Sequence, residues 1–101
     1  MKLLDAVFLV AQMQDGACIC SKRPFHQSSE AVIVQLTEDL AVPEQTKAQG
    51  FEYFLEKDGV LELLQLADGR LKSKEAKVEL VCYYADFDAY PAWFNELAAR
   101  S

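Results

Sequence analysis

Residues 3–20 read LLDAVFLVAQMQDGACIC, and this stretch decides the fold that the sequence predicts. Two apolar segments flank the pair Asp15-Gly16. An Asp-Gly pair in that setting is typical of a tight hairpin turn, because such turns need positive φ angles at both central residues. We therefore predict strands at 3–13 and 17–23 that pair with each other as a hairpin.

Asp-Gly pairs recur at 58–59 and 68–69 and set the limits of later elements. The apolar stretch VLELLQL at 60–66 lies between these two pairs, which favours a strand over a helix. AVIVQLT at 31–37 has the consecutive β-branched residues of a central strand that is covered on both sides. KVELVCYYA at 77–85 would place every second side chain on one apolar face, and it predicts a further strand.

Two helices complete the predicted fold. Residues 43–59 have a proline at the first helical position and a glycine just past the last one, although a strand over 51–55 is the alternative. A second helix begins near 88–91, where an aspartate can cap it and a proline is tolerated. The order β-β-β-α-β-β-α predicts a single compact α+β domain over 1–101. Its architecture would be a two-layer sandwich: a mainly antiparallel sheet of about five strands, with two helices packed on one face.

Composition and charge narrow the classes of partner. The 101 residues are 51% hydrophobic and 26% charged, as in folded globular proteins, and the formal net charge is −6. Residues 30–62 hold eight Asp and Glu against two Lys, which excludes a nucleic-acid partner because phosphates are bound through Lys and Arg. The apolar run at 6–11 is too short to span a bilayer and lacks the features of a signal peptide. We therefore expect a cytoplasmic protein with no membrane partner.

The three cysteines are candidate metal ligands or nucleophiles. Cys18 and Cys20 would lie on the core face of the predicted hairpin, together with Val7, Leu9, Ala11 and Met13. Zinc signatures space their cysteines by two to four residues and present them on loops, whereas free cysteine packs as a small hydrophobe. A redox role is the alternative, and it would require a lowered thiol pKa. We interpret the cysteines as packing residues, and expect no metal and no cofactor.

Residues 83–94, YYADFDAYPAWF, hold six of the eleven aromatic residues of the chain. Three of them are accounted for by the predicted strand face and helical stripe: Tyr84, Tyr90 and Phe94. The rest of the cluster provides our candidate ligand-binding or interface residues: Tyr83, Asp86, Phe87, Asp88 and Trp93. Carboxylates among aromatic rings can bind a cation through charge and ring faces, although the aspartates can also serve as helix caps.

These observations favour a non-enzymatic binding or accessory module, dimeric, that recognises a protein partner or a small ligand, a cationic one included. The alternative is a small enzyme with a shallow acid–base site that uses His26, the one histidine, with Asp86 or Asp88. A third hypothesis is an acidic decoy or immunity-type protein that blocks a basic surface through residues 30–62.

Overall fold

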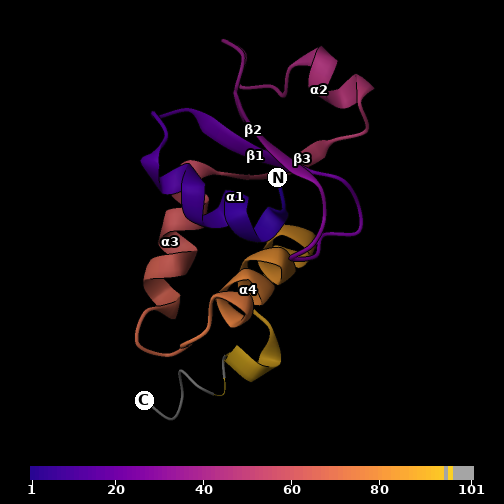
Figure 1. Ribbon diagram of the computed structural model, residues 1–101. Coiled ribbons are helices and arrows are strands. Elements are labelled where there is room, and N and C mark those ends of the chain that lie inside the picture. Colours follow the sequence, from indigo (N-terminus) through magenta and orange to yellow (C-terminus); the bar gives the residue numbers. More distant parts are fainter. Residues whose placement is uncertain (95, 97–101) are drawn as a thin grey trace.

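The computed structural model describes residues 1–94 and Glu96, and these residues form an antiparallel sheet of three strands covered by helices. The strands are β1 (Ala17–Ser21), β2 (Ala31–Gln35) and β3 (Glu52–Glu56), in the order β2-β1-β3 (Figure 1). The helices are α1 (Leu3–Leu9), the short 3-10 helix η1 (Val10–Gln12), α2 (Glu44–Ala48), α3 (Lys57–Ala67) and α4 (Lys74–Phe87). The predicted α+β class is confirmed, whereas the predicted sheet of about five strands is not.

β1 is the central strand because its small and apolar side chains, ACICS, are covered on both faces of the sheet. All five residues of β1 are buried. Both neighbouring strands run antiparallel to β1, and Ile19 lies opposite Ile33 of β2 and Leu55 of β3. The prediction of a central strand at 31–37 is wrong, because β2 lies at an edge of the sheet and its residues are mostly half-buried.

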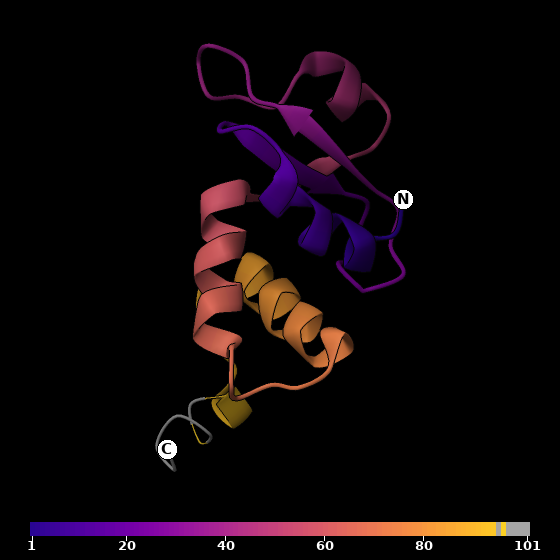
Figure 2. The ribbon, with the colours of Figure 1, turned by 60° about the vertical axis from the view of Figure 1, so that its left-hand side comes forward.

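The two faces of the sheet are covered by different parts of the chain. Ala17 and Ile19 of β1 face the main hydrophobic core, where α1, α3 and α4 pack (Figures 1 and 2). Cys18 and Cys20 face the opposite side, where Phe51 and other apolar residues of the segment around α2 cover them. The predicted packing of two helices on one face is not confirmed, since three helices cover one face and the segment around α2 covers the other.

The predicted first strand, 3–13, is helical in the structure and becomes α1 and η1. Four apolar residues at the spacing i, i+3, i+4 and i+7 are fully buried: Leu3, Ala6, Val7 and Val10. This spacing is the core stripe of a helix, and an unbroken apolar run does not distinguish it from a strand. The turn at Asp15-Gly16 exists, with Gly16 at a φ of 88°, but it joins a helix to a strand and forms no hairpin.

The predicted strands at 60–66 and 77–85 are also wrong, because they lie within α3 and α4. Val60, Leu63 and Ala67 are the buried residues of α3, again at helical spacing. α4 begins at an N-cap, Ser73, whose side chain accepts a hydrogen bond from the backbone N–H of Ala76 at 3.1 Å. Such a cap satisfies one of the donors left free at the start of a helix.

The predicted helix over 43–59 is correct only in its first part, since α2 ends at Ala48. Gly50 follows with a φ of 90°, and this left-handed residue turns the chain into β3. The alternative strand over 51–55 is therefore the correct one, one residue displaced. Residues 92–94 are helical, as expected of the last predicted helix, and its continuation past residue 96 lies outside the described part of the chain.

Within residues 1–94 and at Glu96, no helix is both long and apolar enough to cross a membrane.

Candidate functional site

The five predicted site residues lie in two places. Tyr83, Asp86 and Phe87 belong to the last two turns of α4, and Asp88 follows as its C-cap. Trp93 packs instead beside the small apolar cluster of Leu71, Leu80 and Phe94 and is half-buried there. The structure therefore brings four of the candidates to one end of α4 and separates the fifth from them.

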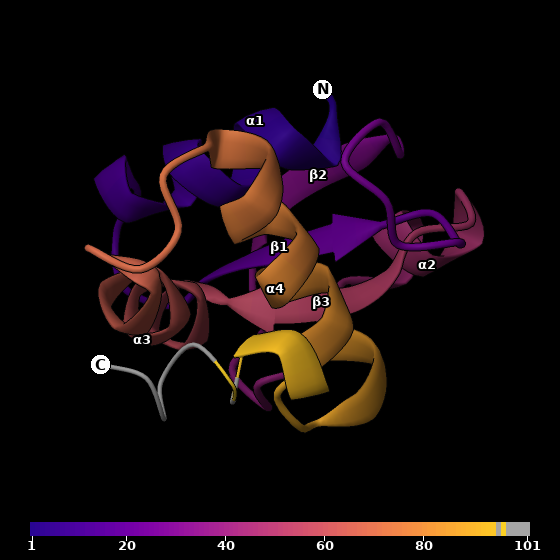
Figure 3. The ribbon, with the colours of Figure 1, turned by 90° about the horizontal axis from the view of Figure 1, so that it is seen from below.

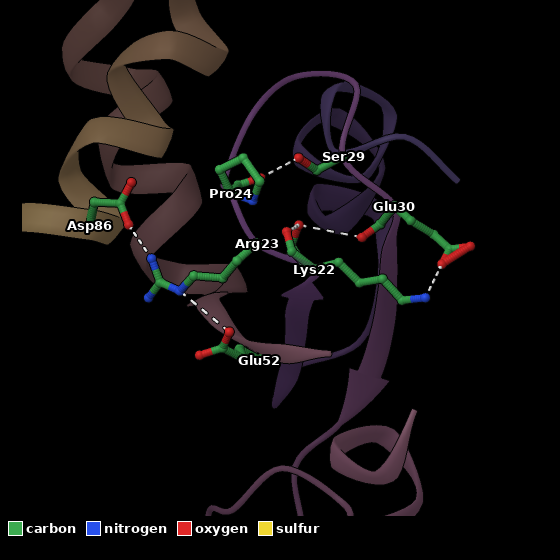
Figure 4. A network of polar contacts seen from close by, with 8 residues as sticks. Lys22, Arg23, Pro24, Ser29, Glu30, Glu52 and Asp86 are labelled. Atoms are coloured by element: carbon green, nitrogen blue, oxygen red, sulfur yellow. Dashed lines mark hydrogen bonds and ion pairs between the residues drawn. The ribbon is translucent and has the colours of Figure 1, made fainter. Parts of the chain in front are cut away.

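Asp86 accepts a hydrogen bond from the guanidinium of Arg23, which lies just after β1. The same guanidinium reaches the carboxylate of Glu52 on β3 at 3.4 Å, so Arg23 lies between two acidic groups (Figure 4). The hydrogen bond to Asp86 raises the pKa of Arg23 above its usual value, and Glu52 adds to this effect. Asp86 is therefore already neutralised by the chain itself and is poorly placed to bind an external cation.

Arg23 also fixes the start of the loop at 22–29. Its guanidinium carbon lies 4.1 Å from the centre of the Phe25 ring, which is a cation–π contact. Phe25 in turn packs edge-on against Phe54 of β3, with ring centres 5.0 Å apart. The hydroxyl of Ser29 donates to the carbonyl of Pro24 and closes the loop on itself (Figure 4).

Asp88 ends α4 in the left-handed conformation, with a φ of 52°, and its backbone N–H donates to the carbonyl of Tyr84 at 2.8 Å. The Asp88 carboxylate raises the pKa of the Tyr84 hydroxyl, chiefly by its negative charge. The ring of Tyr84 also packs against the ring of Tyr90, with ring centres 5.6 Å apart. Asp88 thus ends the helix, which is the structural role that the sequence offered as the alternative to ligand binding.

Tyr83 and Phe87 form an exposed aromatic pair on the surface of α4. Their ring centres lie 4.6 Å apart, and 36% of Tyr83 and 64% of Phe87 are exposed to solvent. Residues four apart are neighbours on a helix surface, so the contact follows from the helical spacing. The two rings together expose apolar surface at the end of α4.

A cleft lies where the loop at 22–29 meets α4, with a volume of about 480 Å³. Its lining combines a buried ring, a thiol, a histidine, two carboxylates and small polar groups: Phe25, His26, Gln27, Ser73, Glu75, Ala76, Glu79 and Cys82. In Figure 3, α4 lies in front of the sheet. The loop provides one wall of the cleft, and the part of α4 from its N-cap Ser73 to Cys82 provides the other.

Negative charge dominates this cleft. Glu75 and Glu79 are exposed and lie one helical turn apart on α4, and among the described residues neither has an ion-pair partner. Cys82 lies one further turn along. Burial raises the pKa of its thiol to about 12, and the charges of Asp86 and Glu79 act in the same direction. The thiol therefore stays protonated at neutral pH, and it contributes an apolar surface and no nucleophile.

His26 lies on the rim of the cleft and is held by its own loop. Its Nδ1 accepts a hydrogen bond from the backbone N–H of Ser28 at 3.2 Å, and its backbone N–H donates to Ser29. Within the described chain it forms no hydrogen bond with Asp86 or Asp88. The structure therefore does not bring together the acid–base set of the enzyme hypothesis.

Cys18 and Cys20 are buried on the face of the sheet that lies away from α4. They contact Phe51 and Val42, so the predicted buried face exists but has different neighbours from those predicted. A hydrogen bond with the sulfur of Cys20 raises the pKa of Cys18, and burial adds to this effect. Among the described residues, no group of three or more His, Cys, Asp or Glu is arranged to hold a metal ion.

Sequence reasoning missed Glu75 and Glu79, because it placed Glu79 within the predicted strand at 77–85 and Glu75 in the segment just before that strand. A helical interpretation of 74–87 would have found them. Glu75, Glu79, Tyr83 and Phe87 recur every four residues and form one row on the helix surface.

No protein-family model, curated protein or solved structure matches this chain.

Proposed function

We propose that the protein is a non-enzymatic binding module that holds a cationic group in the cleft between the loop at 22–29 and α4. The observation that carries this proposal is the pair of carboxylates, Glu75 and Glu79, which line the cleft without an ion-pair partner in the described chain. Two negative charges one helical turn apart repel each other, and a bound cation would relieve that repulsion.

The lining also suggests which cation the cleft would accept. Ala76, Phe25 and Cys82 provide an apolar wall beside the carboxylates. An alkyl ammonium or alkyl guanidinium group fits this combination, because its stem can cover apolar surface while its charged end reaches a carboxylate. Each charge-assisted hydrogen bond would contribute about 1.5–3 kcal/mol before the cost of ordering the ligand.

Two features of the cleft support binding over catalysis. The Cys82 thiol has a pKa of about 12 and is mostly buried, which is the opposite of what a cysteine nucleophile needs. Among the described residues, the ring of His26 hydrogen-bonds only within its own loop, and Asp86 is paired with Arg23 instead.

The proposal can be tested by NMR titration of the labelled protein with n-butylamine, with 1-butanol as the uncharged control of the same length. We expect the amine, and not the alcohol, to shift the backbone amides of 25–27 and 73–82. The variant E75Q/E79Q should lose this response. The matched variant E38Q/D39N removes the same charge from the loop after β2 and should retain it. Equal amine binding by wild type and E75Q/E79Q would overturn the proposal.

A further inference from the structure

The cleft and the exposed aromatic pair lie on one continuous row of α4. Glu75, Glu79, Tyr83 and Phe87 are each separated by four residues, so they form a row on the helix surface that is inclined to the axis of α4. The row begins with two carboxylates in the cleft and ends with two stacked rings at the surface. A ligand that lies along α4 can therefore contact both ends at once.

We propose that the natural ligand is a basic segment of another protein, with a Lys or Arg in the cleft and an apolar side chain on the Tyr83–Phe87 pair. This inference rests on the proposed function of the cleft. A free amine would use only the carboxylate end of the row and would leave Phe87, which is 64% exposed, uncovered. A protein segment covers both ends.

The helix fixes the spacing that such a segment must have. The midpoint of Glu75 and Glu79 and the midpoint of Tyr83 and Phe87 are eight residues apart in α4. At about 1.5 Å per residue this is a separation of about 12 Å along the helix axis. An extended chain advances about 3.3 Å per residue, so the cationic and apolar side chains should be about four residues apart.

Charge favours a basic partner over a second copy of this chain. A symmetric dimer places the same surface on both subunits. Contact of the Tyr83–Phe87 pair with the same pair of a second copy provides no cation for Glu75 and Glu79, whereas a basic segment does. Asp86, which directly precedes Phe87 in α4, is neutralised by Arg23, so the aromatic end of the row does not demand a charge from the ligand.

The experiment measures the affinities of capped peptides that contain one Arg and one Leu in a Gly-Ser background. The Leu is placed two, four or six residues from the Arg, in both orders. We expect one of the two peptides with a spacing of four to bind about tenfold more tightly than those with spacings of two and six, as a single aromatic contact permits. The variant Phe87→Ser should remove the tighter binding of the peptide with a spacing of four. The control variant Leu40→Ser should retain it, because Leu40 is 76% exposed on another part of the molecule.

The outcomes separate this inference from the proposed function. If n-butylamine binds in the cleft but neither spacing nor Phe87→Ser changes the peptide affinity, the inference is overturned and the proposed function stands. If neither the amine nor any peptide binds, both are overturned. If sedimentation shows a dimer that Phe87→Ser dissociates, a second copy occupies the aromatic pair and the inference is again overturned. Circular dichroism of each variant shows that it is folded before its affinity is compared.

Discussion

Replacement of Gly59 by alanine tests the reassignment of residues 60–66 from a strand to part of a helix, α3. In the structure Gly59 lies in the first turn of α3, with no positive φ. A Cβ atom added there would lie 3.8 Å from a methyl carbon of Leu55, which is ordinary van der Waals contact. Glycine inside a helix costs about 0.5–1 kcal/mol relative to alanine. Gly59→Ala should therefore increase the free energy of unfolding by about 0.5–1 kcal/mol.

The same substitution at the neighbouring Asp-Gly pair is the matched control. Gly69 has a φ of 82° and open space around its missing Cβ, so its substitution changes backbone strain and nothing else. A left-handed conformation costs a residue with a Cβ about 1–2 kcal/mol. Gly69→Ala should therefore decrease the free energy of unfolding by about this amount, opposite in sign to Gly59→Ala.

The assay is urea denaturation followed by far-ultraviolet circular dichroism, with the midpoint and slope measured for both variants and the wild type. An increase for Gly59→Ala together with a decrease for Gly69→Ala is the expected pair of results. If Gly59→Ala destabilises as much as Gly69→Ala does, residues 58–59 form a turn with positive φ, and the helical assignment of α3 is refuted.

Three further predictions concern the core and the cleft. Phe54→Ala should reduce the free energy of unfolding by about 3–5 kcal/mol in urea denaturation, because the side chain is 1% exposed and packs on Phe25. Ser73→Ala removes the N-cap of α4 and should cost about 1 kcal/mol in the same assay, whereas Ser73→Asp should retain most of the stability. Burial raises the pKa of Cys82 from 9.0 to about 12, so the folded state favours the protonated thiol. The stability that this group contributes is therefore present below pH 9 and is lost as the pH rises toward 12. At pH 10.5 the wild type should have lost about 2 kcal/mol of its free energy of unfolding through this group. Between pH 8.5 and 10.5 the free energy of unfolding of Cys82→Ala should therefore fall less steeply than that of the wild type. Parallel curves of unfolding free energy against pH for the two proteins would contradict the pKa shift.

The sequence alone predicted the α+β class and the strands that contain β-branched residues. ACICS and AVIVQ are short and are bounded by turn residues, so their assignments needed little tertiary context. The strand at 52–56 was foreseen only as an alternative, because the apolar residues of 43–59 also fit a helical spacing. Gly50 decides between the two structures, since it ends α2 with a positive φ.

The segments that were assigned wrongly are long apolar runs in which the apolar residues fit both the spacing of a helix and the alternation of a strand. At 77–85 the alternation of Val78, Leu80 and Cys82 is real, but Val81 is also fully buried, which a strand with one core face does not allow. The Asp-Gly pairs then favoured strands, although Asp58-Gly59 lies inside the first turn of α3. Asp and Gly are common both in turns and at helix ends, so the pair does not specify a hairpin when its flanks are helical.

The candidate site was predicted only in part, because part of it depends on the helical assignment of α4. Tyr83, Asp86, Phe87 and Asp88 were found by their composition, which does not depend on the type of secondary structure. Glu75 and Glu79 required the correct helical period, and the wall formed by Phe25 required a contact between distant parts of the chain. The partner of Asp86 is Arg23, 63 residues away, and no local pattern predicts such a pair.

The most direct test of the binding site is the map of backbone amide shifts when the tighter of the two Arg–Leu peptides with a spacing of four is added to the labelled protein. The proposed site predicts shifts confined to 23–29 and to α4, and their loss in E75Q/E79Q. Shifts centred on the acidic loop at 37–45, unchanged in E75Q/E79Q, would contradict it and would place recognition on the acidic segment 30–62 instead.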